Sequence, residues 1–305
     1  MQPTKLRGII PPMITPLKGD DELDREGAVR LTEHLVAGGV HAIFLLGTTG
    51  EAQSLTYRLR YEFVELVCRQ VAGRVPVLVG VTDTAFIESI RLAEHAAKCG
   101  AVGVVAAPPY YFAPSQQELI EYYTALADAL PLPLYLYNMP SHVKVFLEPA
   151  TVKTLASHPN IVGLKDSSAN MTYFQTLLYH LGDNPDFSLY VGPEELTGEC
   201  VLLGADGGVN GGANIFPELY VAMYDAACAH DIARVREIQR RIMQISTSVY
   251  TVGKYGSSYL KGVKCALSLL GVCDDYLSYP YRKFRTEERA RIRQALEALD
   301  ANCNV

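Results

Sequence analysis

Short apolar runs rich in β-branched residues recur along the chain up to about residue 215, and amphipathic stretches separate them. These runs begin at Gly8, Ala42, Pro76, Val102, Leu132, Ile161, Phe187 and Ala205. The stretches between them, such as residues 26–39 and 86–100, repeat their apolar side chains with the period of a helix. Strands that alternate with helices pair in parallel through right-handed crossovers. The pattern therefore predicts an α/β fold, a closed (β/α)8 TIM barrel.

The end of the chain has a different pattern. From about Asp231 it contains helix-like stretches at residues 232–246, 258–271 and 286–299, without strand runs between them. We predict a catalytic barrel over residues 1–230 and a C-terminal all-helical domain over residues 231–305. An open doubly wound sheet is the competing architecture, but it favours a GxGxxG turn after the first strand, and residues 8–20 contain none.

Composition excludes several classes of partner. The 305 residues carry 27 basic and 33 acidic side chains, and a net charge of −6 gives no electrostatic footprint for nucleic acid or an anionic membrane. No window approaches the roughly 18 apolar residues of a membrane span, and residues 1–13 lack a secretory signal, so we expect a cytoplasmic protein. The seven histidines and seven cysteines are scattered, which disfavours a metal site.

One lysine at a strand end is the first candidate for chemistry. Side chains alternate across a strand, so Gly163 and Lys165 share the inward face, and Tyr135 and Tyr137 do so in the preceding strand. A nucleophilic lysine must be desolvated, and a barrel interior would provide this beside a phenol that could carry protons. This suits Schiff-base chemistry on a 2-oxo acid. The alternative is a lysine that reaches water or pairs with Asp166.

The second candidate is the sequence GTTGE at residues 47–51, which follows the second predicted strand. The hydroxyls of Thr48 and Thr49, together with amide groups of the glycine-flanked loop, could bind a carboxylate with neutral donors. An ordinary turn in which Thr48 or Thr49 caps the next helix is equally compatible with this motif.

Five motifs together resemble a known superfamily. They are GTTGE, the pair Tyr110 and Tyr111 in APPYYFAPS, YNMPS from Tyr137, GLKDSS from Gly163, and GADGGVNGGAN from Gly204. Their order and spacing are similar to those of the pyruvate-dependent class I aldolases, which include the dihydrodipicolinate synthase and N-acetylneuraminate lyase family. The resemblance runs from about Gly8 into the predicted helix at residues 258–271. It implies a (β/α)8 barrel with C-terminal helices, a homotetramer built as a dimer of dimers, and no metal or organic cofactor.

The resemblance also implies roles for single residues. Lys165 would be the Schiff-base lysine and Tyr137 the proton-transfer tyrosine. Thr48, Thr49 and Gly50 would bind the pyruvate carboxylate, with Thr49 also counted as catalytic, and Tyr111 would reach in from a neighbouring subunit. The remaining expected substrate contacts are His142, Ser167, Gly192, Glu194, Glu195, Val209 and Asn210.

Departures from the family pattern bear on the second substrate. The lysine-pathway synthase normally carries an arginine two residues after the YNxP proline, where this chain has His142, and Val143 and Lys144 replace the Thr-Gly that follows. Histidine cannot offer a bidentate guanidinium to a carboxylated aldehyde, although Lys144 could act as a point charge. Glu194 and Glu195 align with an acidic pair that binds sugar hydroxyls in the sialic acid lyase. Ser167 aligns with a threonine that does likewise.

These observations lead to a ranked set of functions. The leading interpretation is a class I aldolase, a carbon-carbon lyase that reversibly cleaves a 2-keto-3-deoxy sugar acid, or a substrate like N-acetylneuraminate, to pyruvate and an aldehyde. The first alternative is 4-hydroxy-tetrahydrodipicolinate synthase, which condenses pyruvate with aspartate semialdehyde. A dehydratase working through the same imine is a third possibility. A non-catalytic binding or regulatory homologue is a fourth, which the retained lysine, tyrosine and threonines disfavour.

Overall fold

The computed structural model describes residues 5–301 and contains an eight-stranded sheet with parallel pairing throughout. All eight predicted strands are present, so the prediction from the alternating pattern is confirmed. The strands are β1 (Gly8–Ile9), β4 (Ile43–Leu45), β5 (Val77–Gly80), β6 (Gly103–Ala106), β7 (Leu134–Asn138), β8 (Ile161–Asp166), β9 (Ser188–Val191) and β10 (Gly207–Gly208).

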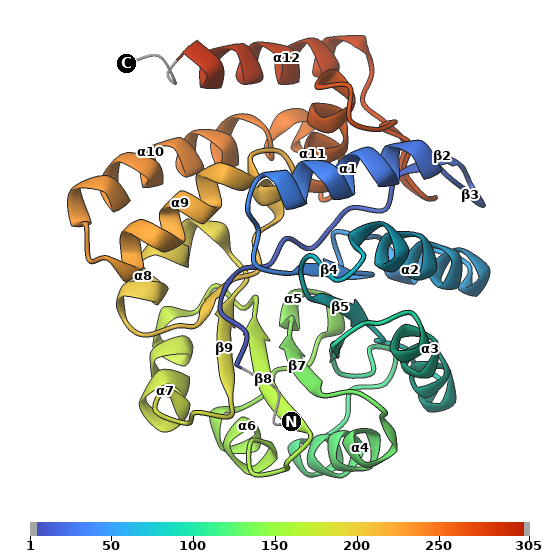
Figure 1. The fold of residues 1–305 in the computed structure, drawn as a ribbon, viewed down its shortest axis with the longest axis vertical. Helices are drawn as coiled ribbons and strands as arrows, with labels where there is room; N and C mark the ends of the chain where they lie inside the picture. Colours follow the sequence, from blue (N-terminus) through green and yellow to red (C-terminus); the bar gives the residue numbers. More distant parts are fainter. Residues whose placement is uncertain (1–4, 302–305) are drawn as a thin grey trace.

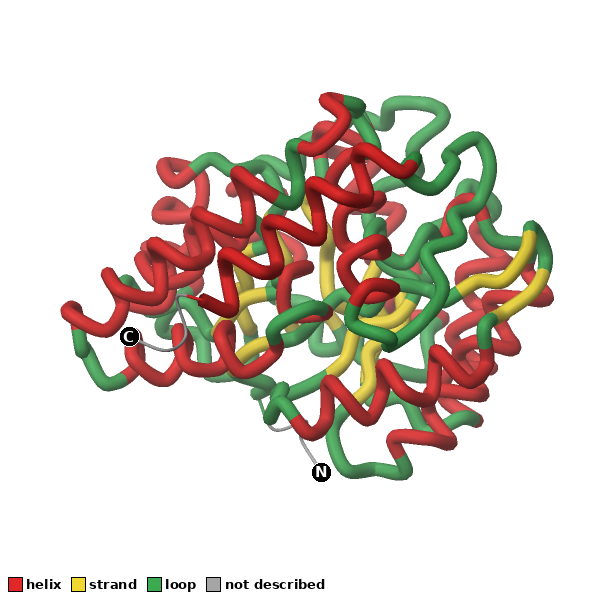
Figure 2. Tube along the Cα trace, turned by 90° about the horizontal axis from the view of Figure 1, so that it is seen from above, coloured by secondary structure: helices red, strands yellow, loops and turns green. Residues whose placement is uncertain are grey.

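The sheet closes into a barrel beside its first strand. The strand order is β1, β10, β9, β8, β7, β6, β5, β4, so β1 and β4 lie at the two ends of the hydrogen-bonded series. Just after β1, Pro12 forms a parallel bridge with Phe44 of β4. The Met13 N–H donates to the Phe44 carbonyl at 2.9 Å, and the Phe44 N–H donates to the Pro11 carbonyl at 3.0 Å. In Figure 2 the barrel strands occupy the interior and helices surround them, while a separate two-stranded hairpin lies at the edge of the molecule.

Helices follow the strands around the barrel, as a (β/α)8 fold requires. They are α1 (Arg25–Ala37), α2 (Tyr57–Val71), α3 (Phe86–Lys98), α4 (Gln116–Ala129), α5 (Pro140–Val143), α6 (Pro149–Leu155), α7 (Met171–Leu181), α8 (Thr197–Leu202) and α9 (Pro217–Cys228). Short 3₁₀ turns occupy Ala52–Ser54, Glu194–Leu196, Gly211–Asn214 and Val252–Lys254.

Local sequence signals explain where several of these helices begin. The Ser115 hydroxyl accepts from the Glu118 N–H while the Glu118 carboxylate accepts from the Ser115 N–H, which is a capping box at the start of α4. Thr56 caps α2 in a similar way by accepting from the Leu59 N–H. The strand pattern did not predict one element, the antiparallel hairpin of β2 (Leu17–Gly19) and β3 (Glu22–Leu23).

Three helices follow α9: α10 (Ile232–Ser248), α11 (Ser258–Leu269) and α12 (Thr286–Ala301). Figure 1 shows them together at one side of the barrel, in orange and red. The helix α10 packs against both α9 and α12, and α12 also packs against α11. The expected helical character of this region is confirmed, while the domain boundary at residue 231 stays a prediction. No helix within residues 5–301 has the length and apolarity needed to cross a membrane.

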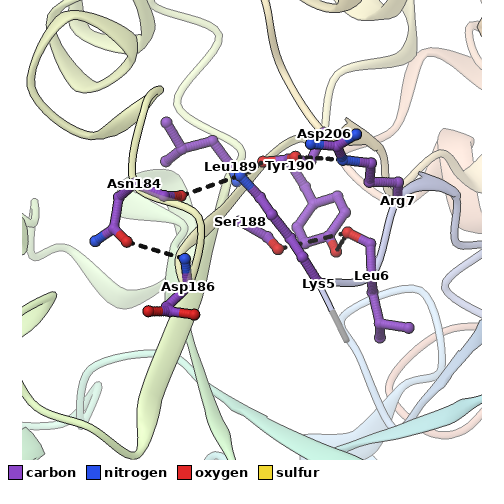
Figure 3. A network of polar contacts seen from close by, with 9 residues as sticks. All are labelled: Lys5, Leu6, Arg7, Asn184, Asp186, Ser188, Leu189, Tyr190 and Asp206. Carbon is purple, nitrogen blue, oxygen red and sulfur yellow. Dashed lines mark hydrogen bonds and ion pairs between the residues drawn. The ribbon is translucent and has the colours of Figure 1, made fainter. Parts of the chain in front are cut away.

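A polar network ties the first described residues to the sheet (Figure 3). The buried Asp206 carboxylate forms ion pairs with Lys5 Nζ at 3.1 Å and Arg7 Nε at 3.3 Å. It also accepts a hydrogen bond from the Leu189 N–H at 2.9 Å. Asp206 comes just before β10 and Leu189 lies near the start of β9, so this network lies at the end of the barrel where the strands begin.

Candidate active site

Tyr137 and Lys165 lie side by side in adjacent strands. In the register of β7 and β8, Tyr137 pairs with Lys165 and Tyr135 pairs with Gly163. Both Tyr137 and Lys165 are buried, and Lys165 Nζ lies 4.2 Å from the centroid of the Tyr137 ring. The alternation of side chains in the sequence predicted this pairing.

Lys165 does not pair with its neighbour Asp166. The Asp166 carboxylate instead accepts hydrogen bonds from Asn138 Nδ2 at 2.8 Å and from the Ser168 hydroxyl at 2.9 Å. The Lys165 side chain is shielded from water by a largely apolar layer of the barrel interior. This layer consists of Ile10, Phe44, Leu78, Val105, Tyr135, Tyr190 and Val209. An amine in such surroundings is partly stripped of water, which a nucleophilic lysine requires.

The surroundings of Tyr137 perturb its pKa in two opposing directions. Burial raises the pKa of this phenol, but the positive charge of Lys165 and hydrogen bonds with Thr48, Ser167 and Lys165 outweigh that effect. The net result is a pKa below the usual value of the phenol. The Thr48 hydroxyl lies 3.3 Å from the Tyr137 hydroxyl. Tyr137 is therefore placed to exchange protons with the lysine and with a molecule bound beside it.

The loop at residues 47–51 follows β4 and carries both candidate threonines. The Thr49 hydroxyl lies 3.2 Å from the hydroxyl of Tyr259, which belongs to α11. The Gly50 carbonyl accepts a hydrogen bond from the buried Thr15 hydroxyl at 2.7 Å. These contacts fix the loop on both sides.

A cavity of about 340 Å³ opens above Tyr137. Residues from several loops after the strands and from the C-terminal helical region line it. Its polar lining includes Thr48, Thr49, Tyr110, Tyr137, His142, Tyr259 and Tyr281. No lysine or arginine belongs to the lining among the residues that the structure describes.

Tyr110 and His142 contribute to this cavity, whereas Tyr111 does not. The Tyr111 side chain is 80% exposed and packs edge to face on Phe112, which is itself 82% exposed. Partial loss of water lowers the pKa of His142 below its ordinary value, so the ring is neutral at pH 7. Its Nδ1 lies 3.0 Å from the Ser141 hydroxyl.

Glu194 and Glu195 are engaged elsewhere, which differs from the expectation that they bind sugar hydroxyls. The buried Glu194 carboxylate accepts hydrogen bonds from the Tyr220 hydroxyl at 2.5 Å, the Tyr250 hydroxyl at 2.6 Å and the Gly212 N–H at 2.8 Å. The Glu195 carboxylate accepts from Ser246 of α10. Within the described part of the chain, neither glutamate lines the cavity.

Other expected contact residues form a layer next to Lys165. The Ser167 hydroxyl lies directly over Gly192, where a Cβ would come within 2.1 Å of it. Asn210 Nδ2 donates to the Gly192 carbonyl at 3.3 Å, and Val209 belongs to the apolar layer beneath Lys165. A hydrogen bond joins Ser167 to the Tyr137 side chain, so this layer is connected to Tyr137 and Lys165.

Sequence reasoning missed two residues of the site, both on α11. Tyr259 contacts Thr49, and Lys264, also on α11, forms a buried ion pair with Glu51. Both lie more than 200 positions after the loop that they contact, so no local spacing could have revealed them. The only sequence signal was the apolar character of the helix around Lys264. Residues 5–301 contain no group of three or more side chains that could hold a metal ion.

Comparisons with known proteins agree with this geometry. The model of the dihydrodipicolinate synthetase family matches residues 5–299. The structure of a dihydrodipicolinate synthase from Bacteroides thetaiotaomicron is 60% identical and superposes with a TM-score of 0.94, covering 96% of this chain and 98% of the other. The 4-hydroxy-tetrahydrodipicolinate synthase of Methanospirillum hungatei is 32% identical over 96% of this chain and 99% of its own length.

A further relative carries a different activity in its name. YagE of Escherichia coli K12, a candidate 2-dehydro-3-deoxy-D-gluconate aldolase, is 35% identical over 78% of this chain and 80% of its own length. Its crystal structure in complex with pyruvate superposes with a TM-score of 0.91, at 31% identity over 96% of this chain and 98% of that chain.

Proposed function

Because the chain belongs to the dihydrodipicolinate synthetase family, we propose that its cavity binds pyruvate and that Lys165 forms a Schiff base with it. The observation that carries this proposal is the buried Lys165 beside Tyr137, at the ends of two adjacent barrel strands. A relative with a related fold, YagE, has been crystallised with pyruvate. The enzyme would be a carbon-carbon lyase that needs no metal or organic cofactor for this step.

The chemistry begins with the neutral amine. Lys165 Nζ attacks the ketone carbon of pyruvate, and loss of water from the carbinolamine gives the imine. The Tyr137 hydroxyl, hydrogen-bonded to Thr48, carries protons to the departing oxygen. Removal of a proton from the methyl carbon then gives an enamine, which attacks the carbonyl carbon of an aldehyde. Cleavage is the reverse of this sequence.

The pyruvate carboxylate would lie at the loop of residues 47–51. The hydroxyls of Thr48 and Thr49 and the amide of Gly50 are neutral donors, so they can bind the anion without adding a second positive charge beside Lys165. Each hydroxyl also contacts a tyrosine, Tyr137 for Thr48 and Tyr259 for Thr49, and these contacts orient the donors.

The comparisons favour aspartate semialdehyde as the second substrate. This reverses the ranking that the sequence suggested, since relatives such as the Methanospirillum hungatei protein are named 4-hydroxy-tetrahydrodipicolinate synthase. The structure also weakens the argument for a sugar acid, because Glu194 and Glu195 are occupied by tyrosine, serine and backbone partners. We therefore propose condensation of pyruvate with aspartate semialdehyde as the first candidate reaction.

One observation keeps sugar-acid cleavage as the second candidate. The described lining of the cavity carries hydroxyls and a neutral histidine but no guanidinium or ammonium group to hold the carboxylate of aspartate semialdehyde. Neutral hydroxyls suit a polyhydroxylated aldehyde. YagE, the relative named as a candidate 2-dehydro-3-deoxy-D-gluconate aldolase, supports the same alternative.

An aldehyde panel separates the two candidates. Pyruvate consumption is measured with aspartate semialdehyde, glyceraldehyde, glycolaldehyde and N-acetylmannosamine, with Lys165→Ala as the inactive control. We expect aspartate semialdehyde to give the highest kcat/KM. A neutral aldehyde that exceeds it by about tenfold or more would favour the sugar-acid reaction instead. Activity that survives in Lys165→Ala would contradict the Schiff base itself.

A further inference from the structure

Glu51 and Lys264 form an ion pair deep inside the protein. Glu51 is the last residue of the threonine loop at residues 47–51, and Lys264 lies on α11 in the C-terminal helical region. Glu51 is 6% exposed and Lys264 is fully buried. The carboxylate and the ammonium are in direct contact. The pair therefore joins the barrel to the helical region at the edge of the candidate active site.

Both partners make a second contact with the C-terminal region. Glu51 Oε2 accepts a hydrogen bond from the Ser278 N–H at 2.9 Å, and Lys264 Nζ donates to the Tyr276 carbonyl at 2.7 Å. Thus one carboxylate holds both α11 and the segment after it. The helix α11 reaches the same loop again through Tyr259, whose hydroxyl contacts Thr49.

The backbone conformation of the loop at residues 47–51 requires contacts that hold it in place. Glu51 has a φ of 56°, in the left-handed region that non-glycine residues rarely adopt. Such a conformation persists only where surrounding contacts fix it. The carboxylate contacts of Glu51 supply that constraint, and Thr48 and Thr49 lie only three and two positions before it in the same loop.

A contribution to stability does not explain a buried pair of charges well. The cost of removing both charges from water often cancels their attraction, and a well-packed apolar pair of similar volume is often as stable. A fixed geometry is what an ion pair supplies and an apolar contact does not, since its hydrogen bonds are directional. A role in positioning the neighbouring loop fits this requirement.

We propose that Glu51 and Lys264 are positioning residues, which hold Thr48 and Thr49 where they bind the carboxylate of the substrate. This inference rests on the proposed function, because it assigns those two hydroxyls to pyruvate. Through this ion pair, the C-terminal helical region helps to position the threonines of the active site. Loss of the ion pair then weakens pyruvate binding, while Tyr137 on β7 and Lys165 on β8 remain in place.

The test compares two buried carboxylates that each pair with a lysine. Glu51→Gln should raise the KM for pyruvate roughly tenfold, the effect of about one lost charge-assisted hydrogen bond, with kcat at saturating pyruvate within about threefold of wild type. Asp206→Asn is the matched control, because its network lies at the opposite end of the barrel (Figure 3). It should lower thermal stability and leave the KM for pyruvate unchanged.

A double variant keeps the test decisive if Glu51→Gln fails to fold. Glu51→Gln with Lys264→Met removes both buried charges, so thermal stability should return toward that of wild type while the KM for pyruvate stays raised. A stable double variant with the wild-type KM would overturn the proposal. An equal rise of the KM in Asp206→Asn would also overturn it, because the effect would then be general.

Reductive trapping distinguishes failure of this inference from failure of the proposed function. The pyruvate concentration that half-saturates inactivation by borohydride reports pyruvate binding without any aldehyde. We expect this concentration to rise in parallel with KM in Glu51→Gln and in the double variant. If wild type is not trapped at all, the proposed function fails. If wild type is trapped and the variants show its half-saturating concentration, only the positioning role fails.

Discussion

The Tyr137 hydroxyl lies between the Thr48 hydroxyl and the Lys165 ammonium, and this position determines its chemistry. Burial opposes ionisation of the phenol, yet the adjacent positive charge and hydrogen bonds lower its pKa. A phenol that gives up its proton more readily is a better shuttle between the amine and a bound keto acid. The single hydroxyl group of Tyr137 is therefore the most informative atom to remove.

Tyr137→Phe should still bind pyruvate but turn over at least roughly 100-fold more slowly, because the ring is kept and a proton-transfer group is lost. Steady-state kinetics give kcat, and the pyruvate dependence of borohydride inactivation reports binding. Turnover at the wild-type rate would mean that another group carries the proton.

His142 makes a pH-dependent prediction about the acceptor. Its pKa lies below 6.5 because it has lost part of its water, so the ring is neutral at pH 7 and gains charge only as the pH falls through that lowered pKa. A positive charge at His142 would attract a carboxylated aldehyde. The KM for aspartate semialdehyde should therefore decrease at pH values below about 6.5 and increase again as the pH rises.

The matched variant is His142→Gln, which cannot titrate. In this variant the KM for aspartate semialdehyde should no longer depend on pH in this range. The KM for glycolaldehyde should be the same in wild type and in the variant at each pH. An identical pH profile in wild type and variant would show that His142 does not contact the carboxylate.

The sequence could predict the position of those side chains whose direction follows from the alternation of side chains along a strand. The pairing of Tyr137 with Lys165 could be predicted because both strands can be recognised in the sequence and the barrel places them side by side. The partners of Glu194 could not be predicted, because Tyr220 reaches it from α9 and Tyr250 from the turn after α10. Resemblance to a family shows where a carboxylate lies along the chain, but not which hydroxyl groups donate hydrogen bonds to it.

The packing of strand β8 against its neighbours requires a glycine at position 163. A Cβ at Gly163 would come within 2.7 Å of the Tyr135 ring and 2.8 Å of the Ser188 carbonyl. The absence of a side chain thus makes room for Tyr135 in the barrel interior, in the layer beneath Lys165.

Gly163→Ala should destabilise the protein by about 1–3 kcal/mol, the usual cost of overpacking a close-packed interior. Thermal or denaturant unfolding measures this loss. Gly19→Ala is the control, since a Cβ at Gly19 in β2 meets only ordinary contacts at 3.6 Å, and it should change stability by less than about 0.5 kcal/mol. Equal effects of the two substitutions would contradict the packing argument.

The strands and most helices were predictable because periodicity and caps are local signals. The hairpin of β2 and β3 was not, since its strands have only three and two residues and lack an apolar alternation long enough to detect. The sequence predicted a closed barrel but not where it closes, because the bridge between Pro12 and Phe44 joins segments more than 30 positions apart.

For the whole molecule, the exposed pair Tyr111 and Phe112 is the surface that we expect to take part in association. The two rings follow Pro108 and Pro109 and meet edge to face with their centroids 5.1 Å apart, which leaves a large aromatic surface uncovered on one chain. The expected role of Tyr111 in a neighbouring subunit, and the expected homotetramer, stay predictions. Both are consistent with a side chain that points away from its own cavity.

Subunit mixing tests this shared site. Tyr111→Phe and Lys165→Ala should each be nearly inactive alone, because each lacks a part of every site. Mixed oligomers should recover activity, since some sites combine an intact lysine with an intact neighbouring tyrosine. Sedimentation at assay concentration gives the assembly directly. A fully active monomer near 33.5 kDa would contradict the prediction.

The proposed mechanism of the whole molecule depends on an imine at Lys165. The most direct measurement is incubation with pyruvate and borohydride, followed by peptide mass spectrometry. Reduction converts a transient imine into a stable amine, so we expect irreversible inactivation and one reduced pyruvyl group on the peptide that contains Lys165. Labelling at another lysine, or full activity after the same treatment, would contradict a Schiff base at Lys165.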